Sequence, residues 1–470
     1  MTMTTTLSTA LNAVETLLTE CVEDFKNHRN ANTLCEQLKN ECFSIVETFL
    51  TPVIEEVLCD PELLPELKVG AGKMGLHFNG YRSTSIRLLT GNTLHIQSPY
   101  FAKAKPKRRP GRKSKKRNGK SGRHFGLDFL GFVARCSMTL GSAVVQAALL
   151  CPSFDIARKT LKFHSINLDV KTIRRITMEL AACAMGKRGK ISISDADLVD
   201  GKTVLVCIDG GRLRERRVKR GRRPAGQKRQ GYHTDWKEPI QIVIQVVNPD
   251  GEISKTHLPF YDATMGGIDA AFALLETYLR ELGVSKADRV VFCCDGARSY
   301  WKRTAPLAKK LGVSNFYEVI DYTHAKQNLY ELIDKLPKNT SAKDKNQIIE
   351  KWKNLLWEGS LDQLEKEIGQ TIRNSKKRKG ALAKFNSYFL KNRSRMQYAN
   401  FRLLNLPIGS GCVESAIRRV INLRMKSPGS FWKPETAESM LFLRSQLLSG
   451  RWGVMTGNIF KETRRVCSCH

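Results

Sequence analysis

Two stretches of the sequence decide the fold: Val204-Leu205-Val206-Cys207-Ile208-Asp209-Gly210 and Val290-Val291-Phe292-Cys293-Cys294-Asp295-Gly296. Each is a continuous apolar run that ends in Asp-Gly, the pattern of a buried strand that stops at a carboxylate. In α/β folds, ligands bind at the carboxyl ends of the strands, where both carboxylates are expected. A single Asp-Gly after a strand is usually a turn, but the repetition favours one site shared by Asp209 and Asp295.

The segments around these two strands alternate between strand and helix patterns. Apolar patterning predicts further strands at 239–247, 252–260 and 315–321, and helices at 268–282, 297–311, 413–423 and 434–448. Three consecutive strands followed by alternating helix and strand are expected of an RNase H-like core with a mixed sheet. The polar, helical stretch before the Gly-rich turn at 406–412 is expected to be an insertion.

We therefore expect an α/β protein with an RNase H-like mixed-sheet catalytic core, a helical insertion, and N-terminal helical and helix-turn-helix regions. The expected segments are an acidic helical region at 1–70, a β-hairpin and basic linker at 71–128, a helix-turn-helix domain at 129–185, the first part of the core at 200–330, the insertion at 331–405, the second part of the core at 406–450 and a basic tail at 451–470. The hairpin strands are placed at 86–89 and 93–97.

Charge separates the first segment from the rest of the chain. The 470 residues include 78 Lys or Arg and 45 Asp or Glu, for a formal net charge of +33, whereas residues 1–70 carry 12 acidic and 4 basic side chains. A strongly basic body indicates a polyanionic partner, and nucleic acid is the default. The acidic helices predicted within 7–58 are expected to serve packing or self-association.

Composition excludes several other classes of protein. No apolar stretch approaches the roughly 18 residues needed to span a bilayer, and no apolar core follows a basic start, so we expect no membrane contact and no secretory signal. The thirteen cysteines contain no Cys-x-x-Cys pair. Cys467, Cys469 and His470 are too few for a closed zinc site, and reduced thiols in a cytoplasm are expected.

The helix-turn-helix prediction depends on two helices at 153–162 and 169–180, with a break around 164–167. Asp169 is expected to cap the second helix. The outward residues expected to bind DNA are Lys171, Arg174 and Arg175, and the inward residues are Val170, Ile173, Ile176 and Leu180. An ordinary helical hairpin with a basic wet face stays open as the alternative.

A third carboxylate is needed if divalent cations are to act on a phosphodiester. Glu414 is the candidate, because it opens a helix behind Ile408-Gly409-Ser410-Gly411-Cys412 and basic side chains follow it. Glu435 and Glu438 are rivals. A helix-favouring charge is the other interpretation of Glu414.

Taken together, these motifs resemble those of bacterial insertion-sequence transposases of the DDE, RNase H-like class. The resemblance covers about 150–450 and is carried by Ile208-Asp209-Gly210-Gly211-Arg212, Cys294-Asp295-Gly296-Ala297, Asp321-Tyr322-Thr323-His324, Pro407-Ile408-Gly409-Ser410-Gly411-Cys412-Val413-Glu414-Ser415, Arg424-Met425-Lys426 and Gly429-Ser430-Phe431-Trp432. It implies that Asp209, Asp295 and Glu414 bind two Mg²⁺ (or Mn²⁺) ions and catalyse DNA cleavage and strand transfer.

The resemblance also implies partners and a location. The enzyme would bind double-stranded DNA, both the terminal inverted repeats and the target, as a homodimer or higher oligomer in a nucleoid-associated, cytoplasmic setting. The residues expected to contact DNA besides those of the helix-turn-helix are Arg108, Arg109, Arg112, Arg212, Asp321, His324, Arg418, Arg424 and Lys426. For Asp321, capping of the next helix is an equal alternative.

Three features have two interpretations each. The basic runs at 103–123 and 212–229 are expected to be flexible, phosphate-binding loops, and Arg220-Gly221-Arg222-Arg223-Pro224 only vaguely resembles a minor-groove hook. Trp352 and Trp357 stack on a displaced base or, as we favour, belong to a helical core. The whole chain is alternatively a DNA-binding regulator without catalysis, or a structure-specific nuclease.

Overall fold

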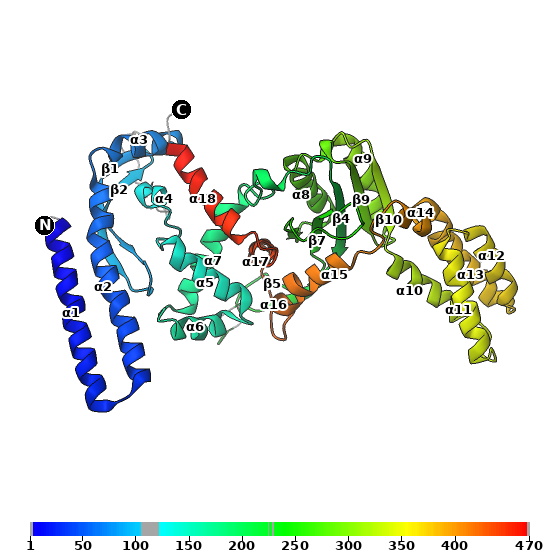
Figure 1. Ribbon diagram of the computed structural model, residues 1–470, viewed down its shortest axis with the longest axis horizontal. Coiled ribbons are helices and arrows are strands. Elements are labelled where there is room, and N and C mark those ends of the chain that lie inside the picture. The colour runs from blue at the N-terminus through cyan, green and yellow to red at the C-terminus, as the bar shows by residue number, and fades with distance from the viewer. Residues whose placement is uncertain (1–2, 105–121, 224, 228–229, 468–470) are drawn as a thin grey trace. The chain divides into compact units, whose positions relative to one another are not determined.

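The computed structural model describes residues 3–104, 122–223, 225–227 and 230–467 (Figure 1). The chain divides into two compact units, Met1–Gly186 with Thr456–His470, and Lys187–Met455. Within the described residues, no helix has the length and apolar character that a membrane span requires.

The N-terminal unit is mostly helical and contains a small antiparallel sheet. Its elements are α1 (Met3–His28), α2 (Ala31–Cys59), α3 (Leu63–Lys73), β1 (His77–Ile86), β2 (Leu94–Ala102), β3 (Gly122–Arg123), α4 (Phe125–Phe129), α5 (Met138–Leu150), α6 (Phe154–Phe163) and α7 (Val170–Met185). The last helix, α18 (Trp452–Cys467), was not predicted; the sequence analysis placed only a basic tail there.

The predicted hairpin exists, but its first strand was misplaced. β1 ends at Ile86, which pairs with Leu94 of β2, so 87–89 is not a strand. The reason is a long-range contact. The buried carboxylate of Glu47 in α2 accepts hydrogen bonds from the backbone amides of Leu89 (2.7 Å) and Thr90 (2.8 Å). These amides therefore satisfy a helix side chain and are not available to a neighbouring strand.

The two helices predicted around residue 165 are confirmed as α6 and α7. The side chains of Ser153 and Asp169 cap them, each accepting a hydrogen bond from the first turn, and the Asp169 bond from the Thr172 amide is 2.8 Å. Ile173, Ile176 and Leu180 are buried as expected. The inward assignment of Val170 is wrong, since this side chain is 37% exposed at the start of the helix.

The Asp169 cap gives a measurable prediction. Replacing Asp169 with Ala should lower the free energy of unfolding of the N-terminal unit by ~1 kcal/mol, because the Thr172 amide loses its acceptor. Urea unfolding followed by circular dichroism measures it. The control is Asp155→Ala, which removes an exposed carboxylate paired with Arg158 and Lys159 and should cost only ~0.3 kcal/mol. Equal losses would contradict the capping role.

The second unit contains a five-stranded mixed sheet in the order β10-β9-β4-β7-β8. The strands are β4 (Thr203–Gly210), β7 (Ile240–Val247), β8 (Phe260–Thr264), β9 (Arg289–Cys294) and β10 (Phe316–Ile320). β4, β7 and β8 form an antiparallel meander, and β9 and β10 run parallel to β4. This mixed α/β arrangement is compatible with an RNase H-like core.

Helices complete this unit. They are α8 (Gly267–Glu281), α9 (Arg298–Lys310), α15 (Gly411–Ile417), α16 (Leu423–Met425) and α17 (Pro434–Leu448), with a π-helical turn at Arg418–Asn422 and short 3₁₀ turns at Asp195–Asp197, Val284–Lys286 and Leu390–Arg395. α15 packs on β4 and β7, and α17 packs on β8. The strand predicted at 252–260 is wrong, because the third strand begins only at Phe260.

The misplaced strand has a tertiary cause. β8 is buried along its whole length and contains Asp262, a residue that sequence patterns assign to turns. The buried carboxylate of Asp262 is paired with the guanidinium of Arg188 at 2.7 Å. This long-range ion pair makes an acidic side chain tolerable in a core strand.

The predicted helical insertion is present. It comprises α10 (Tyr322–Ile333), α11 (Ala342–Trp357), α12 (Leu361–Thr371), α13 (Ser375–Tyr388) and α14 (Tyr398–Leu403), which Figure 1 shows grouped beyond β10. Trp352 is fully buried, and the ring of Trp357 stacks on that of Tyr398 at 6.5 Å between centroids. Both tryptophans therefore belong to the helical core, the interpretation that the sequence favoured.

Candidate functional site

Asp209 and Asp295 lie side by side at one edge of the five-stranded sheet. β4 and β9 pair in parallel with Val206 opposite Phe292, and each chain continues three residues to its aspartate. The carboxylate of Asp209 accepts a hydrogen bond from the Gly210 amide at 2.7 Å, and that of Asp295 accepts one from the Ala297 amide at 2.9 Å. Both side chains are half-buried.

The glycine after each aspartate is required by a close neighbour. A Cβ on Gly210 would come within 2.0 Å of Oε1 of Glu238, and a Cβ on Gly296 would come within 2.3 Å of the Tyr388 ring. The repeated Asp-Gly pattern therefore reflects crowding around two carboxylates. It also identifies Glu238 as an additional acidic group beside this edge. No sequence signal marked Glu238, because it lies between the two Asp-Gly motifs and belongs to neither.

Glu414 acts on the first aspartate through its charge. It lies, exposed, on α15, which packs on β4 and β7. Burial raises the pKa of Asp209, and the negative charges of Asp295 and Glu414 raise it further, against the opposing effect of the Gly210 amide. The charges of Asp295 and Glu414 therefore both act on Asp209.

The rival carboxylates are used elsewhere. Glu438 accepts a hydrogen bond from the amide of Met265 at 2.6 Å and pairs with the guanidinium of Arg188. Glu435 is exposed in the first turn of α17. Among the three candidates of the sequence analysis, only Glu414 influences the charge state of Asp209.

A layer of thiols lies behind the three carboxylates. Cys207, Cys293 and Cys412 each precede one of the three acidic residues by two positions. Cys207 forms hydrogen bonds with the thiols of Cys293 and Cys412, and these bonds together with burial raise its pKa far above the usual value. The thiols thus connect β4, β9 and α15 below the acidic edge. From the sequence alone, these cysteines were expected only to be reduced. The signal that marks the layer is that each cysteine stands two positions before an acidic residue.

Asp321 holds the loop that leads into α15, the helix that contains Glu414. Its carboxylate is 1% exposed and caps α10 by accepting a hydrogen bond from the His324 amide at 2.8 Å. The same carboxylate accepts hydrogen bonds from the amide and the hydroxyl of Ser410, the hydroxyl at 2.8 Å. Burial would raise the pKa of Asp321, but these bonds and that of the His324 ring outweigh it and lower the pKa. Capping, one of the two expectations for Asp321, is confirmed.

His324 is half-buried beside the acidic edge. Its Nδ1 lies 3.3 Å from Oδ1 of Asp321. This hydrogen bond raises the pKa of His324, and the charges of Asp295 and Asp209 add to the effect. A more readily protonated imidazole therefore stands next to three carboxylates, where it offers a positive charge to a phosphate.

Two tyrosines enclose the same edge. Burial and the charges of Asp295 and Asp209 raise the pKa of Tyr300, which lies on α9. Burial and the charges of Asp295 and Asp321 likewise raise the pKa of Tyr388, which lies on α13. Both therefore stay neutral hydroxyls that face a charged site. No sequence signal marked them, since helix periodicity places them in the core.

The other residues expected to contact DNA are scattered. Arg212, Arg418 and Lys426 are exposed in the second unit, and Lys171, Arg174 and Arg175 are exposed on α7 of the first unit. Arg424 is only 3% exposed, with its guanidinium 5.1 Å from the Trp432 ring centroid. Arg108, Arg109 and Arg112 lie outside the described residues.

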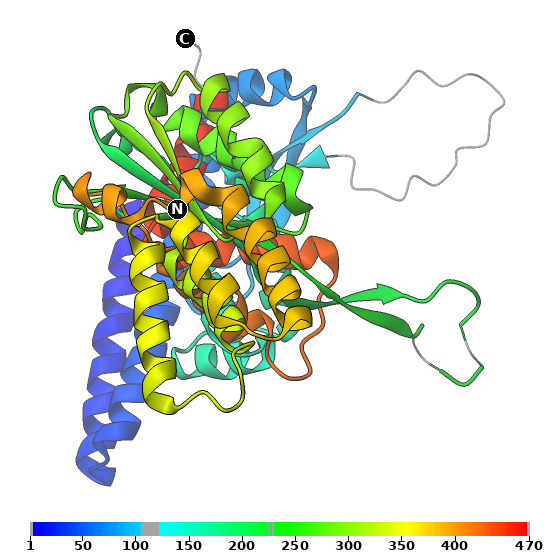
Figure 2. The same cartoon turned by 90° about the vertical axis from the view of Figure 1, so that its right-hand side faces the viewer.

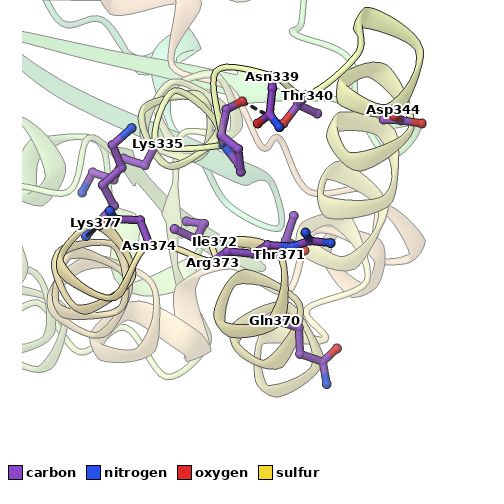
Figure 3. A pocket seen from close by; sticks show the side chains of 11 residues that line it. Lys335, Asn339, Thr340, Asp344, Gln370, Thr371, Ile372, Arg373, Asn374 and Lys377 are labelled. Atoms are coloured by element: carbon purple, nitrogen blue, oxygen red, sulfur yellow. Dashed lines mark hydrogen bonds between the residues drawn. The ribbon is translucent and has the colours of Figure 1, made fainter.

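The insertion contains a separate hollow of about 590 Å³ (Figure 3). It is lined by the turn after α10, the starts of α11 and α13 and the end of α12, with Lys335, Arg373 and Lys377 among its residues. None of the residues predicted to be catalytic lines it. In the described ranges, no three Asp, Glu, His or Cys side chains are close enough together to hold a metal ion by themselves.

Comparisons with known proteins add little. No protein-family model and no curated protein matches the sequence. One similar solved structure is the Drosophila P element transposase strand transfer complex, with a TM-score of 0.25 and 13% identity, over 69% of this chain and 83% of that chain. A likeness of this size assigns neither a fold family nor an activity to the chain.

Proposed function

We propose that this chain is a DNA transposase that cleaves and joins DNA with the carboxylates of Asp209, Asp295 and Glu414. One observation carries the proposal. Asp209 and Asp295 follow two adjacent parallel strands of a mixed sheet, and the charge of Glu414, 205 positions after Asp209, acts on Asp209 and raises its pKa. A basic chain with such an edge suits chemistry on a phosphodiester.

The donor set fits Mg²⁺. Carboxylate oxygens are its preferred protein ligands, and Mg²⁺ is commonly held by one or two carboxylates with waters and substrate phosphates completing its shell. Asp209 and Asp295 follow adjacent strands and the charge of Glu414 acts on Asp209, so these three would hold the ions together with water and substrate phosphate, and the ions would relieve the repulsion at Asp209. When bound, the ions would activate the attacking oxygen and stabilise the leaving one.

The chain's own residues position the substrate. A protonated His324 would attract the scissile phosphate, and Asp321 keeps its imidazole oriented through the Nδ1 contact. Asp321 also ties the 408–411 loop to α10, which fixes the start of the helix that bears Glu414. The neutral hydroxyls of Tyr300 and Tyr388 would donate to phosphate oxygens and limit access of water.

Joining two DNA ends requires at least two copies of the enzyme. α1 offers a surface through which two copies could associate. Its exposed apolar side chains are Leu11, Leu18, Val22 and Phe25, which recur at helical spacing on one stripe. We assign this stripe to self-association of the chain.

The experiment compares wild type with Glu414→Gln on a labelled duplex that carries the element's flanking ends and a supercoiled target. With Mg²⁺, wild type should nick the end and join it to the target, and EDTA should abolish both. Glu414→Gln should lose ~10²-fold or more in cleavage rate. Cleavage without joining would indicate a nuclease, and tight end binding without cleavage in any metal would indicate a regulator.

A further inference from the structure

A two-stranded ribbon projects from the strand that ends at Asp209. β5 (Leu213–Val218) and β6 (Tyr232–Lys237) pair antiparallel and belong to no other sheet (Figure 2). The ribbon packs against the 427–432 segment, where Phe431 lies 5.8 Å from the Tyr232 ring and 4.7 Å from the Arg214 guanidinium. Trp432 donates its amide to the Arg214 carbonyl at 2.9 Å and accepts from the Arg216 amide at 2.8 Å. The expectation that 212–229 is entirely a flexible loop is therefore wrong at its start, which is a strand.

One face of the ribbon combines arginines with exposed aromatic rings. The register places Arg214 opposite Trp236 and Val218 opposite Tyr232, and Arg216 lies between them on the same face. Trp236 is 57% exposed and Tyr232 is 44% exposed. The guanidinium of Arg214 is 5.6 Å from the Trp236 centroid, and that of Arg216 is 5.7 Å from the Tyr232 centroid. Rings thus hold both guanidinium planes in place.

No carboxylate neutralises the guanidinium groups of this face. Among the described residues, neither Arg214 nor Arg216 forms an ion pair, and Arg214 donates one guanidinium hydrogen bond to the Ser427 carbonyl at 3.2 Å. The acidic residues of the ribbon lie on the opposite face, where Glu215 pairs with Arg217. The arginine–aromatic face is therefore cationic, with donors that no carboxylate of the ribbon occupies.

Charge continues to the end of the ribbon. No Asp or Glu occurs between Glu215 and Asp235, while Lys219, Arg220 and Arg222 are exposed. A cationic surface of this density is complementary to a polyphosphate backbone. A two-stranded ribbon has the width that the major groove of duplex DNA admits.

We propose that the β5–β6 ribbon docks in the groove of the duplex next to the cleavage site, with its arginine–aromatic face toward the DNA. The assignment rests on the proposed function in one respect, that the polyanion is the DNA that the carboxylate edge cleaves. β5 begins at Leu213, four residues after Asp209. A duplex that lies along the ribbon therefore leads directly to the carboxylate edge of the sheet. The ribbon fixes where the duplex lies relative to the carboxylates.

The test measures binding of a labelled duplex by fluorescence anisotropy between 50 and 200 mM salt, in EDTA, with the full chain. The variant Arg216→Gln/Arg220→Gln/Arg222→Gln removes three ribbon charges. The matched control, Lys343→Gln/Lys366→Gln/Lys379→Gln, removes three exposed charges from the insertion. The ribbon variant should reduce the slope of log K against log salt by ~2–3, whereas the control should reduce it by less than ~1. Equal slopes for the two variants would overturn the proposal.

A second variant separates groove docking from stacking on single strands. Trp236→Ala should weaken binding to duplex ~3–10-fold. A loss confined to single-stranded DNA, or a stronger loss with duplex RNA than with duplex DNA, would overturn docking in a DNA groove. Because binding is measured without cleavage, ribbon-dependent binding by a chain that never cleaves would refute only the proposed function. If the ribbon variants cleaved DNA as the wild type does, only the proposed docking of the ribbon would be refuted.

Discussion

Asp209→Asn should lower the rate of Mg²⁺-dependent DNA cleavage by ~10³-fold while DNA affinity changes by less than about 2-fold. Asn keeps the size and the hydrogen bond from the Gly210 amide but removes the charge that a divalent cation requires. Single-turnover cleavage of a labelled duplex measures the rate, and anisotropy measures the affinity.

The matched control for this variant is Asp288→Asn. Asp288 lies just before β9, at the end of the strand opposite to Asp295, and its carboxylate pairs with Arg289 on the surface. It shares the chemical change but not the site, so cleavage should stay within about 2-fold of wild type. If Asp209→Asn nicked DNA at the wild-type rate, Asp209 would have no role in the reaction.

Asp209→Asn should lower cleavage but raise the stability of the fold. The pKa of Asp209 is raised in the folded protein, so its ionised form destabilises the fold. This cost begins as the pH rises through the unfolded value of roughly 3.9 and is complete above the raised folded value. At neutral pH, Asp209→Asn should therefore increase the free energy of unfolding by ~0.5–2 kcal/mol, and the gain should vanish in acid. A destabilised variant at pH 7 would contradict the electrostatic account of the site.

Asp321→Ala should cost ~2–4 kcal/mol of stability, because it removes a helix cap and leaves the buried Ser410 amide and hydroxyl without their acceptor. Cleavage should fall as well, since the 408–411 loop that leads to Glu414 is no longer tied to α10. Thermal unfolding and cleavage by the remaining folded protein measure the two effects. Asp321→Asn, which keeps one acceptor oxygen, should lose less on both.

The pH dependence of this contribution follows from its sign. The pKa of Asp321 is lowered in the folded state, so its stabilisation is fully present above the unfolded value of about 3.9. It is lost as the pH falls through that value toward the lower folded one. The difference in stability between wild type and Asp321→Ala should therefore shrink in acid. A constant difference from pH 7 to pH 2 would show that the charge of Asp321 is unimportant.

The sequence predicted most of the sheet and helices of the second unit because their signals are local. Apolar runs marked β4, β7, β9 and β10 to within about one residue, and helical spacing marked α8, α9 and α17. It failed where distant side chains intervene. Glu47 took the amides that were expected to form a strand, and Arg188 allowed Asp262 to enter one.

The sequence by itself determined where most strands of the sheet lie along the chain, the two carboxylates at strand ends and the contrast between an acidic start and a basic body, since each is a property of neighbouring residues. Only the tertiary structure decided the order of the strands in the sheet, that the charge of Glu414 acts on Asp209 while Glu438 pairs with Arg188, that Asp321 accepts hydrogen bonds from Ser410, and that a basic run begins as a ribbon. These outcomes depend on contacts between residues far apart in the chain, whose energies no local pattern encodes.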